Sequence, residues 1–230
     1  MKRIFEKTWK SARRLNRENI LSLIYPKPKA CMLDCGCGNG DFTLEVANKL
    51  QTNRIYGVEA CKDFIRLSES KNIKVKEGDL NKKIPYESNF FDLVVSDQVI
   101  EHLQDTDIFL DEIYRVLKKG AIAIISTENL ASWHNIFALL LGWEPFSTTN
   151  FSCSKLGIGN PLANLRGESQ RNLLLRHVKV FSYQGLKEFF EAKGFIFEQT
   201  IGAGYYPLPA FFGKIDPRHA AFITMKIRKP

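Results

Sequence analysis

The sequence predicts an α/β fold in which helices cover both faces of a mostly parallel sheet. Between residues 30 and 127, short apolar runs alternate with segments of helical periodicity. Such alternation builds right-handed βαβ units, whose strands run parallel. A turn with glycines at positions 36, 38 and 40 follows the first apolar run. The length of 230 residues suits one domain of about 180 residues with an inserted cap.

The expected elements follow one another along the chain. Apolar residues at helical spacing predict a helix over 11–25, which the prolines at 26 and 28 would end. Up to residue 127 we expect strands at about 30–34, 54–59, 73–77, 91–96 and 120–127, and helices at about 41–50, 61–71 and 106–117. Ser182 begins a further helix that ends at Lys193-Gly194, and two strands are expected over 195–201 and 220–227.

The stretch from 128 to 181 is too long for a simple connection between a strand and a helix, so we interpret it as an insertion. Its first part, residues 130–143, is apolar almost all round. This pattern predicts a lid helix buried against the sheet edge or against the acceptor. A helix that lies on a membrane is less favoured, because this segment lacks a basic face.

The glycine turn indicates a ligand site. Glycines permit positive φ and carry no Cβ, so a ligand can lie against main-chain amides at the start of a helix. A dinucleotide fingerprint is disfavoured, because Asp41 would place a negative charge where a pyrophosphate must sit. Asp34 can accept a hydrogen bond from an ammonium group while the amides bind a carboxylate. S-adenosylmethionine (SAM) has both groups and a positive sulfonium.

Several segments, in order, resemble one known family. They are Asp34–Gly40, Arg54–Glu59, Glu77–Leu80, Phe91–Leu103 and Glu112–Gly120. Together they resemble the class I SAM-dependent methyltransferases that carry D-x-G-C-G-x-G early and E-H-L later. The resemblance covers residues 10–128 and, less closely, 180–230. It departs from the pattern at Glu59, where Asp is as common, and at Lys119-Gly120-Ala121, where the group prefers Pro-Gly-Gly.

The resemblance implies a fold, a cofactor and a site. The fold is a seven-stranded Rossmann-like sheet, mostly parallel, with its last strand antiparallel and a cap inserted between strand 5 and the last helix. Residues 1–128 and 181–230 would form the SAM-binding domain, and residues 129–180 the lid that binds the acceptor. Glu59 would hold the ribose hydroxyls and Asp79 would contact the adenine amine. The residues expected to bind SAM are Asp34, Gly36, Cys37, Gly38, Gly40, Glu59, Ala60, Asp79, Leu80, Ser96 and Asp97.

Methyl transfer from a sulfonium mainly requires that the acceptor be aligned and that water be excluded. A hydroxyl or amine acceptor also benefits from a base, most often a histidine. We take His102, His134 and His177 as the candidates, and His219 as a weaker one. Asp97 or Glu101 is the alternative base.

No metal is expected, because the spacing of the five cysteines forms no C-x-x-C pair and no histidine cluster follows them. Cys31, Cys35, Cys37, Cys61 and Cys153 are expected to be buried, reduced thiols. The charged N-terminal segment and the lack of an 18-residue apolar stretch predict a cytoplasmic protein without a transmembrane segment.

The net charge of +8 lies largely in the two ends of the chain. The leading hypothesis is methylation, at oxygen, of a small-molecule, glycan or lipid-linked acceptor, and it is compatible with peripheral membrane contact. One alternative is an RNA methyltransferase that uses the basic ends, but Ser96-Asp97-Gln98-Val99 stands where base-amine methylases carry Asn/Asp-Pro-Pro-Tyr/Phe. Another is a catalytically silent regulatory subunit, which the intact glycine turn and acids disfavour. The oligomeric state is not predicted.

Overall fold

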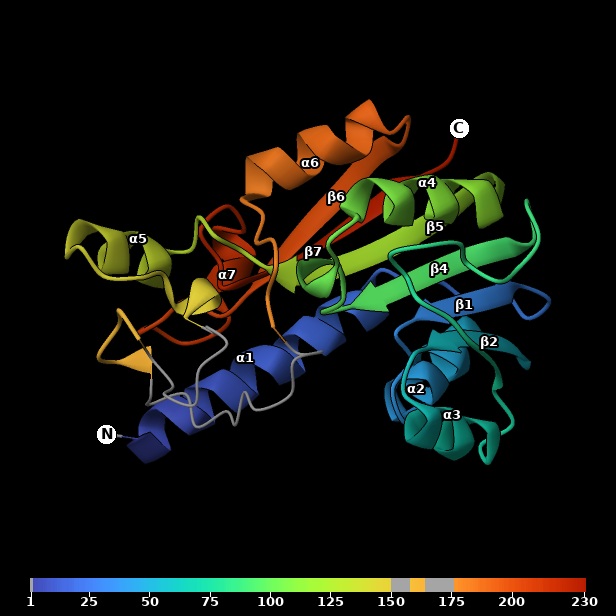
Figure 1. Ribbon diagram of the computed structural model, residues 1–230, viewed down its shortest axis with the longest axis horizontal. Helices are drawn as coiled ribbons and strands as arrows, with labels where there is room; N and C mark the ends of the chain where they lie inside the picture. The colour runs from blue at the N-terminus through green and yellow to red at the C-terminus, as the bar shows by residue number, and fades with distance from the viewer. Residues whose placement is uncertain (1, 150–157, 164–175) are drawn as a thin grey trace.

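The computed structural model describes residues 2–149, 158–163 and 176–230, and within them the chain forms one seven-stranded sheet with helices on both faces (Figure 1). The strand order is β3-β2-β1-β4-β5-β7-β6. The strands are β1 Cys31–Cys35, β2 Arg54–Glu59, β3 Lys74–Glu77, β4 Phe91–Asp97, β5 Leu117–Glu128, β6 Ile196–Ala203 and β7 Phe222–Arg228.

Strand directions follow the expectation. The pairs β3–β2, β2–β1, β1–β4 and β4–β5 are all parallel. The last strand in the chain, β7, lies between β5 and β6 and runs antiparallel to both. The predicted fold class, with its antiparallel last strand, is therefore confirmed.

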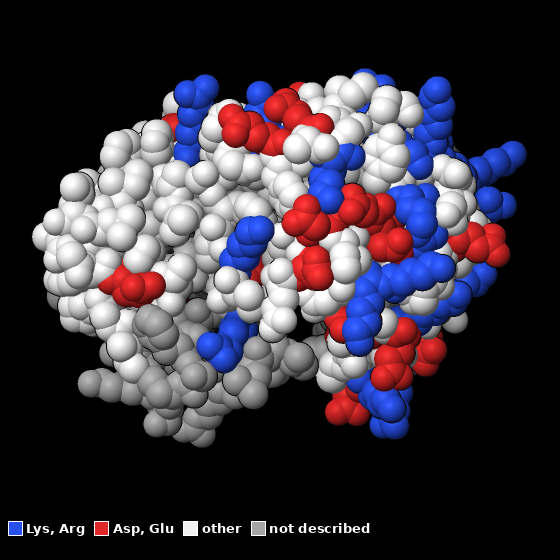
Figure 2. Space-filling view, turned by 45° about the horizontal axis from the view of Figure 1, so that its top comes forward, with Lys and Arg blue, Asp and Glu red and all other residues white. Residues whose placement is uncertain are grey.

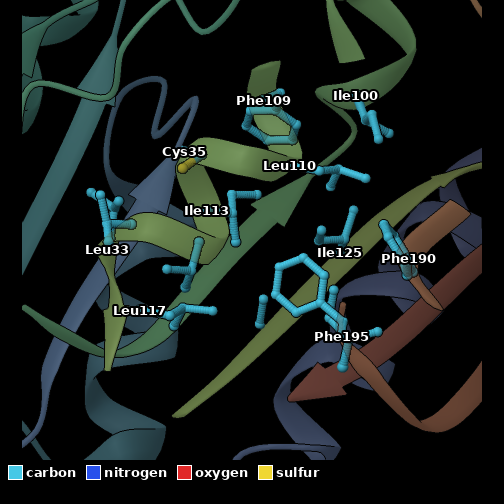
Figure 3. Close-up of a cluster of buried hydrophobic side chains, with 14 of the residues drawn as sticks. Leu33, Cys35, Ile100, Phe109, Leu110, Ile113, Leu117, Ile125, Phe190 and Phe195 are labelled. Atoms are coloured by element: carbon cyan, nitrogen blue, oxygen red, sulfur yellow. The ribbon is translucent and has the colours of Figure 1, made fainter. Parts of the chain in front are cut away.

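Two layers of helices bury the sheet. The helices are α1 Lys2–Ser22, α2 Asp41–Leu50, α3 Lys62–Glu69, α4 Thr106–Val116, α5 Trp133–Leu140, α6 Tyr183–Ala192 and α7 Phe212–Ile215, with 3-10 turns at Ile100–His102 and Phe146–Thr148. One core lies between the sheet and α4 and α6, and its buried cluster contains Phe109, Ile113, Phe190 and Ile125 (Figure 3). A second core, on the other face, holds Ile20 of α1 and side chains of α2.

Several boundaries differ from the expectation. Helix α1 begins at Lys2 rather than near residue 11. Its first half is held by tertiary contacts, since Trp9 packs against Tyr206 and Phe222. Strand β5 begins at Leu117, three residues before the expected start. A short helix, α7, follows α6, which the sequence predicted to be the last helix.

The lid helix is shorter and more exposed than expected. Helix α5 covers Trp133–Leu140, and Phe137, Leu139 and Leu140 expose 55%, 57% and 75% of their surface. The outer face of α5 is therefore not buried against the sheet edge, and burial against the acceptor remains a prediction. Residues 150–157 and 164–175 of the predicted lid lie outside the described residues, and the division into domains remains a prediction.

Candidate functional site

The glycine turn joins β1 to α2 at the carboxyl edge of the sheet. All three glycines have positive φ, namely 77° at Gly36, 53° at Gly38 and 80° at Gly40. A Cβ on Gly36 would come within 2.6 Å of Val99, and one on Gly40 within 2.6 Å of Ile73. A Cβ on Gly38 would meet no atom within 4 Å. Gly36 and Gly40 are therefore required by packing, whereas Gly38 keeps open space over the turn.

Glu59, at the end of β2, is fixed against this turn. Its Oε2 accepts a hydrogen bond from Gly38 N at 2.9 Å. Its Oε1 accepts from the backbone N–H groups of Ala60 and Cys61 at 2.8 and 2.9 Å. The structure thus brings Glu59, Ala60 and the turn together, as the resemblance implies.

Asp34 is the most deeply buried acid of the turn. It is 3% exposed, and its Oδ2 accepts a 2.6 Å hydrogen bond from Thr43 Oγ1. Burial raises the pKa of Asp34 to about 7, and the Thr43 hydrogen bond opposes this shift. Burial also raises the pKa of the neighbouring Cys37 thiol to about 12, so this cysteine stays protonated and is no nucleophile.

The other cysteines give a mixed result. Cys31, Cys35 and Cys37 are buried free thiols, as expected. Cys61 is only partly buried, because it lies at the start of α3 on the molecular surface. Cys153 lies outside the described residues.

The end of β4 contacts α1. Asn16 Nδ2 donates to Asp97 Oδ1 at 3.1 Å, and Arg17 Nε donates to Asp97 Oδ2 at 3.2 Å. Burial raises the pKa of Asp97, while the Arg17 guanidinium opposes the shift. The neighbouring Ser96 hydroxyl is fully buried and has no hydrogen-bond partner among the described residues. A buried hydroxyl of this kind is a feature that a ligand at this edge could satisfy.

Asp79 and Leu80 follow β3. Asp79 accepts hydrogen bonds from Asn81 N and Asn81 Nδ2, both at 3.0 Å, and the Asn81 backbone bond is the main cause of its lowered pKa. The side chain remains 49% exposed, whereas Leu80 is buried. Asp79 therefore lies as a charged group at the rim of the sheet edge, and its contact with adenine remains a prediction.

Two of the candidate histidines lie together beyond β4. The rings of His102 and His177 have centroids 5.0 Å apart. His102 Nδ1 is 2.9 Å from the Arg176 carbonyl oxygen, and His177 Nδ1 is 2.7 Å from the Ser147 carbonyl oxygen. A backbone carbonyl only accepts, so each Nδ1 carries the hydrogen and each Nε2 carries the lone pair when the ring is neutral.

Two buried carboxylates flank this pair. Glu128 Oε2 lies 3.7 Å from His177 Nδ1. Glu101 is fully buried and its Oε2 accepts from Thr127 Oγ1 at 2.9 Å. Burial raises the pKa of Glu101 to about 7, and His177 is the main group that opposes the shift. Glu101, His102 and His177 each offer a ligand atom within 4.8 Å of the others, a proximity that sequence spacing does not reveal.

The other two histidines lie apart from this group. His134, on α5, packs its ring against Phe146 and Tyr206. His219 Nδ1 is 2.9 Å from Asp216 Oδ2, and its ring stacks on Trp133 at 4.6 Å. The structure therefore unites His102 with His177 but not with His134. Asn16, Arg17 and Glu128 were missed by the sequence reasoning, because nothing local to them indicates contact with the end of β4.

Comparisons with known proteins agree with this geometry. A family model described as a methyltransferase domain matches residues 33–125. The demethylmenaquinone methyltransferase of Lactobacillus johnsonii is 30% identical over 186 residues, which cover 75% of this chain and 72% of that protein. A ubiquinone biosynthesis O-methyltransferase of Pelagibacter ubique is 29% identical, and the match spans about half of each chain, 51% and 52%.

Solved structures share the fold. A SAM-dependent methyltransferase from Thermotoga maritima superposes with a TM-score of 0.62 at 17% identity and covers 99% of both chains. One from Mesorhizobium loti gives a TM-score of 0.61 at 14% identity and covers 93% of this chain and 98% of that one. These structures share the fold, and the strand order, the glycine turn and the sequence relatives agree with them. The chain belongs to the class I SAM-dependent methyltransferases, and SAM is its cofactor.

Proposed function

We propose that this enzyme methylates an oxygen of a small-molecule, glycan or lipid-linked acceptor, and that His177 is the general base. The observation that carries the proposal is the fixed imidazole pair at the carboxyl end of β4 and β5. His177 Nδ1 lies 2.7 Å from the Ser147 carbonyl oxygen, a contact that places the hydrogen of the neutral ring on Nδ1 and the lone pair on Nε2.

The residues at the sheet edge fit SAM. Asp34, Gly36, Cys37, Gly38 and Gly40 would hold its methionine part, Glu59 and Ala60 its ribose, Asp79 and Leu80 its adenine, and Ser96 and Asp97 the region near the sulfur. The partnerless Ser96 hydroxyl and the open space over Gly38 support this assignment. When bound, SAM supplies an electrophilic methyl group on a sulfonium.

The surroundings of His177 suit a base. Proton uptake at Nε2 turns the ring into an imidazolium, which the Glu128 carboxylate, 3.7 Å from Nδ1, would stabilise. The side chain of His177 is 13% exposed, so water has little access to it. His102, whose ring lies 5.0 Å away at a tilt of 54°, would position the ring and is the second candidate. His134 is less favoured, because it lies against Phe146 and Tyr206 away from these carboxylates.

The relatives support the acceptor class. One relative is named for demethylmenaquinone, and another for O-methylation in ubiquinone biosynthesis. By analogy with these members of the family, a small organic acceptor is favoured over RNA. The cytoplasm remains the predicted location.

The test uses probe acceptors and labelled SAM. The probes are a hydroquinone with a short isoprenoid tail and an alkyl glycoside with free hydroxyls, and the product is identified by mass spectrometry. We expect an O-methyl product from at least one probe. His177→Gln should lower turnover by about 10²- to 10⁴-fold while SAM affinity stays within a few-fold.

His219→Gln is the matched control, since this histidine lies outside the imidazole pair, and it should retain turnover within about ten-fold. Equal turnover of His177→Gln and the native enzyme would exclude His177 as the base. Transfer to neither probe, or to bulk RNA at physiological salt, would contradict the acceptor class.

A further inference from the structure

One end of the molecule exposes apolar side chains in unusual number. On α5 and directly after it, Phe137, Leu139, Leu140 and Leu141 are 55%, 57%, 75% and 61% exposed. Figure 2 shows that the lobe at this end carries few Lys, Arg, Asp or Glu on the face in view, whereas charges of both signs gather on the opposite lobe. Exposed apolar patches of this kind mark interaction surfaces.

The loop that holds α7 extends the same surface. Phe211 and Ile215 are 53% and 74% exposed. This loop is tied to α5, because Trp133 Nε1 donates to Tyr205 OH at 2.6 Å and the Trp133 ring stacks on His219. We call these six residues, Phe137, Leu139, Leu140, Leu141, Phe211 and Ile215, the apolar end.

Lysines border the apolar end. Lys214 precedes Ile215 and is exposed. Lys7 and Lys10 are exposed on α1, on either side of Trp9, which stacks on Tyr206 of the same loop. The sequence of α5 has no basic face. In the fold, Trp9 of α1 stacks on Tyr206, whose ring packs on His134 of α5, so α1 brings exposed lysines into the neighbourhood of this helix.

We propose that the apolar end docks on the surface of a membrane that contains anionic lipid. Exposed Leu, Ile and Phe side chains would enter the boundary between headgroups and acyl chains, and the lysines would lie against the headgroups. None of the described helices combines the length and apolar character needed to cross a bilayer, so this contact is peripheral. The proposal deepens the proposed function and rests on it, because it selects the lipid-linked class among the acceptors.

The inner side of α5 connects this surface to the catalytic site. Asn135 is buried, and its Nδ2 donates to Ser147 Oγ at 3.0 Å. The Ser147 carbonyl in turn holds His177 Nδ1. One short helix is therefore linked through Ser147 to His177 on its inner side and exposes leucines to solvent on its outer side. This arrangement suits an enzyme that takes its acceptor from a lipid surface. A second copy is a poorer occupant, because a symmetric contact would bring the lysine borders together.

The test is co-sedimentation of the full chain with vesicles. One set is phosphatidylcholine alone, and the other contains about 30 mol% phosphatidylglycerol, which carries the negative charge. We expect binding to the anionic vesicles, weaker binding to the neutral ones, and a loss of about ten-fold or more in partitioning for Leu140→Ser/Ile215→Ser. Lys10→Glu/Lys214→Glu should lose the preference for anionic vesicles.

The matched control is Phe64→Ser/Leu67→Ser on α3, where the native side chains are 44% and 48% exposed in the opposite lobe. It should bind vesicles like the native protein. SAM-induced thermal stabilisation, measured on every variant, reports the fold and the donor site independently of the membrane and of the acceptor assay.

Failure of the native protein to bind anionic vesicles, or an equal loss in the α3 control, overturns the membrane proposal. A dimer in solution that dissociates in Leu140→Ser/Ile215→Ser also overturns it, in favour of a second copy. Neither result bears on the His177 test with probe acceptors in solution.

Discussion

Asp34 is buried, and we propose that it binds SAM. Burial of its carboxylate lowers the stability of the SAM-free protein near neutral pH, whereas SAM binding would raise stability. Its pKa of about 7 lies above its ordinary 3.8, so the folded chain keeps a proton that the unfolded chain has already released. The protonated Asp34 carboxyl therefore makes its full contribution to the unfolding free energy below about pH 4, and this contribution is lost as the pH rises through 7. The side chain of Asp34→Asn does not ionise, so the variant does not lose stability in this way. Without SAM, the variant should gain about 2–4 kcal/mol in unfolding free energy relative to the native protein between pH 5 and pH 8.

Urea unfolding at the two pH values measures this gain. Asp63→Asn, at an exposed position on α3, is the control and should leave the pH dependence unchanged. In thermal-shift titrations, SAM at 100 times its Kd should stabilise the native protein by about 2.7 kcal/mol, and Asp34→Asn should lose most of this effect. An Asp34→Asn protein that still responds fully to SAM would remove Asp34 from the site.

Gly38 allows a ligand contact to be separated from backbone strain. Gly38 and Gly120 both have positive φ, 53° and 74°, and a Cβ on either would meet nothing within 4 Å. Each substitution to Ala should therefore cost about 1–2 kcal/mol of stability through the left-handed backbone alone. Only Gly38→Ala should also weaken SAM binding, because its Cβ would occupy the space over the turn. Isothermal titration calorimetry measures the SAM affinity of both variants. Equal affinities would contradict the placement of Gly38 in the SAM site.

The imidazole pair raises the question of a metal, and we predict that none is needed. Sulfonium displacement requires no Lewis acid, and the proton of the acceptor can pass to His177. Enzyme treated with a chelator and then dialysed should keep its turnover of the probe acceptors. Activity that is lost and then restored by a divalent ion would instead assign Glu101, His102 and His177 as ligands.

At the residue scale, sequence reasoning succeeded where the signal was local. The glycine turn and Glu59 could be identified because the glycines are adjacent in the chain and the acid ends a recognisable strand. The pairing of His102 with His177 could not, since 75 residues separate them. They meet because Val178 N and Lys179 N donate to the Glu101 carbonyl oxygen and His102 Nδ1 contacts the Arg176 carbonyl oxygen. Asn16 was missed for the same reason, because its partner Ser126 is 110 residues away.

At the scale of elements, Asn129 connects the end of β5 to the surrounding loops. Its Nδ2 donates to the carbonyls of Arg218 and Ala220, at 2.8 and 2.9 Å. Its Oδ1 accepts from the N–H groups of Ala131 and Tyr183. The side chain is fully buried, so Asn129→Ala would leave several buried backbone groups unsatisfied.

We expect Asn129→Ala to lower the unfolding free energy by about 2–4 kcal/mol in urea titrations. Asn48→Ala, at an exposed position of α2, is the control and should change it by less than about 0.5 kcal/mol. A small effect at position 129 would show that water replaces the lost hydrogen bonds.

Element boundaries show where periodicity stops being informative. The strands of the sheet centre were located to within a few residues, because each is a short buried apolar run between turns. Residues 2–10 of α1 were missed, since their helix depends on contacts with β7 and its preceding loop. Helix α5 was expected to be buried against the sheet edge or against the acceptor. Its apolar composition alone does not determine which of these covers its outer face, and the sheet edge does not.

At the scale of the whole molecule, the distribution of surface charge determines how strongly the enzyme binds RNA. The net charge is +8, but Figure 2 shows Lys and Arg interspersed with Asp and Glu on the charged lobe of the face in view. Interspersed charges provide no continuous phosphate track on that face. We expect weak RNA retention that falls steeply between about 50 and 200 mM salt, with no methyl transfer to RNA. Filter binding measures RNA retention, and labelled SAM measures methyl transfer to RNA. RNA binding that persists at 200 mM salt would contradict this expectation.

The contacts of Asn16 also set an order of events during synthesis. Asn16 bonds to Ser126 of β5 and accepts from Thr224 Oγ1 of β7 at 3.0 Å, a partner 208 residues later in the chain. While the chain emerges from the ribosome, α1 is made first but has no complete docking surface until β7 has inserted between β5 and β6. Asp97, which depends on Asn16 and Arg17 for its hydrogen bonds, acquires its final environment only then. We therefore expect that a nascent or prematurely terminated chain can display the complete glycine turn and still be unable to transfer a methyl group.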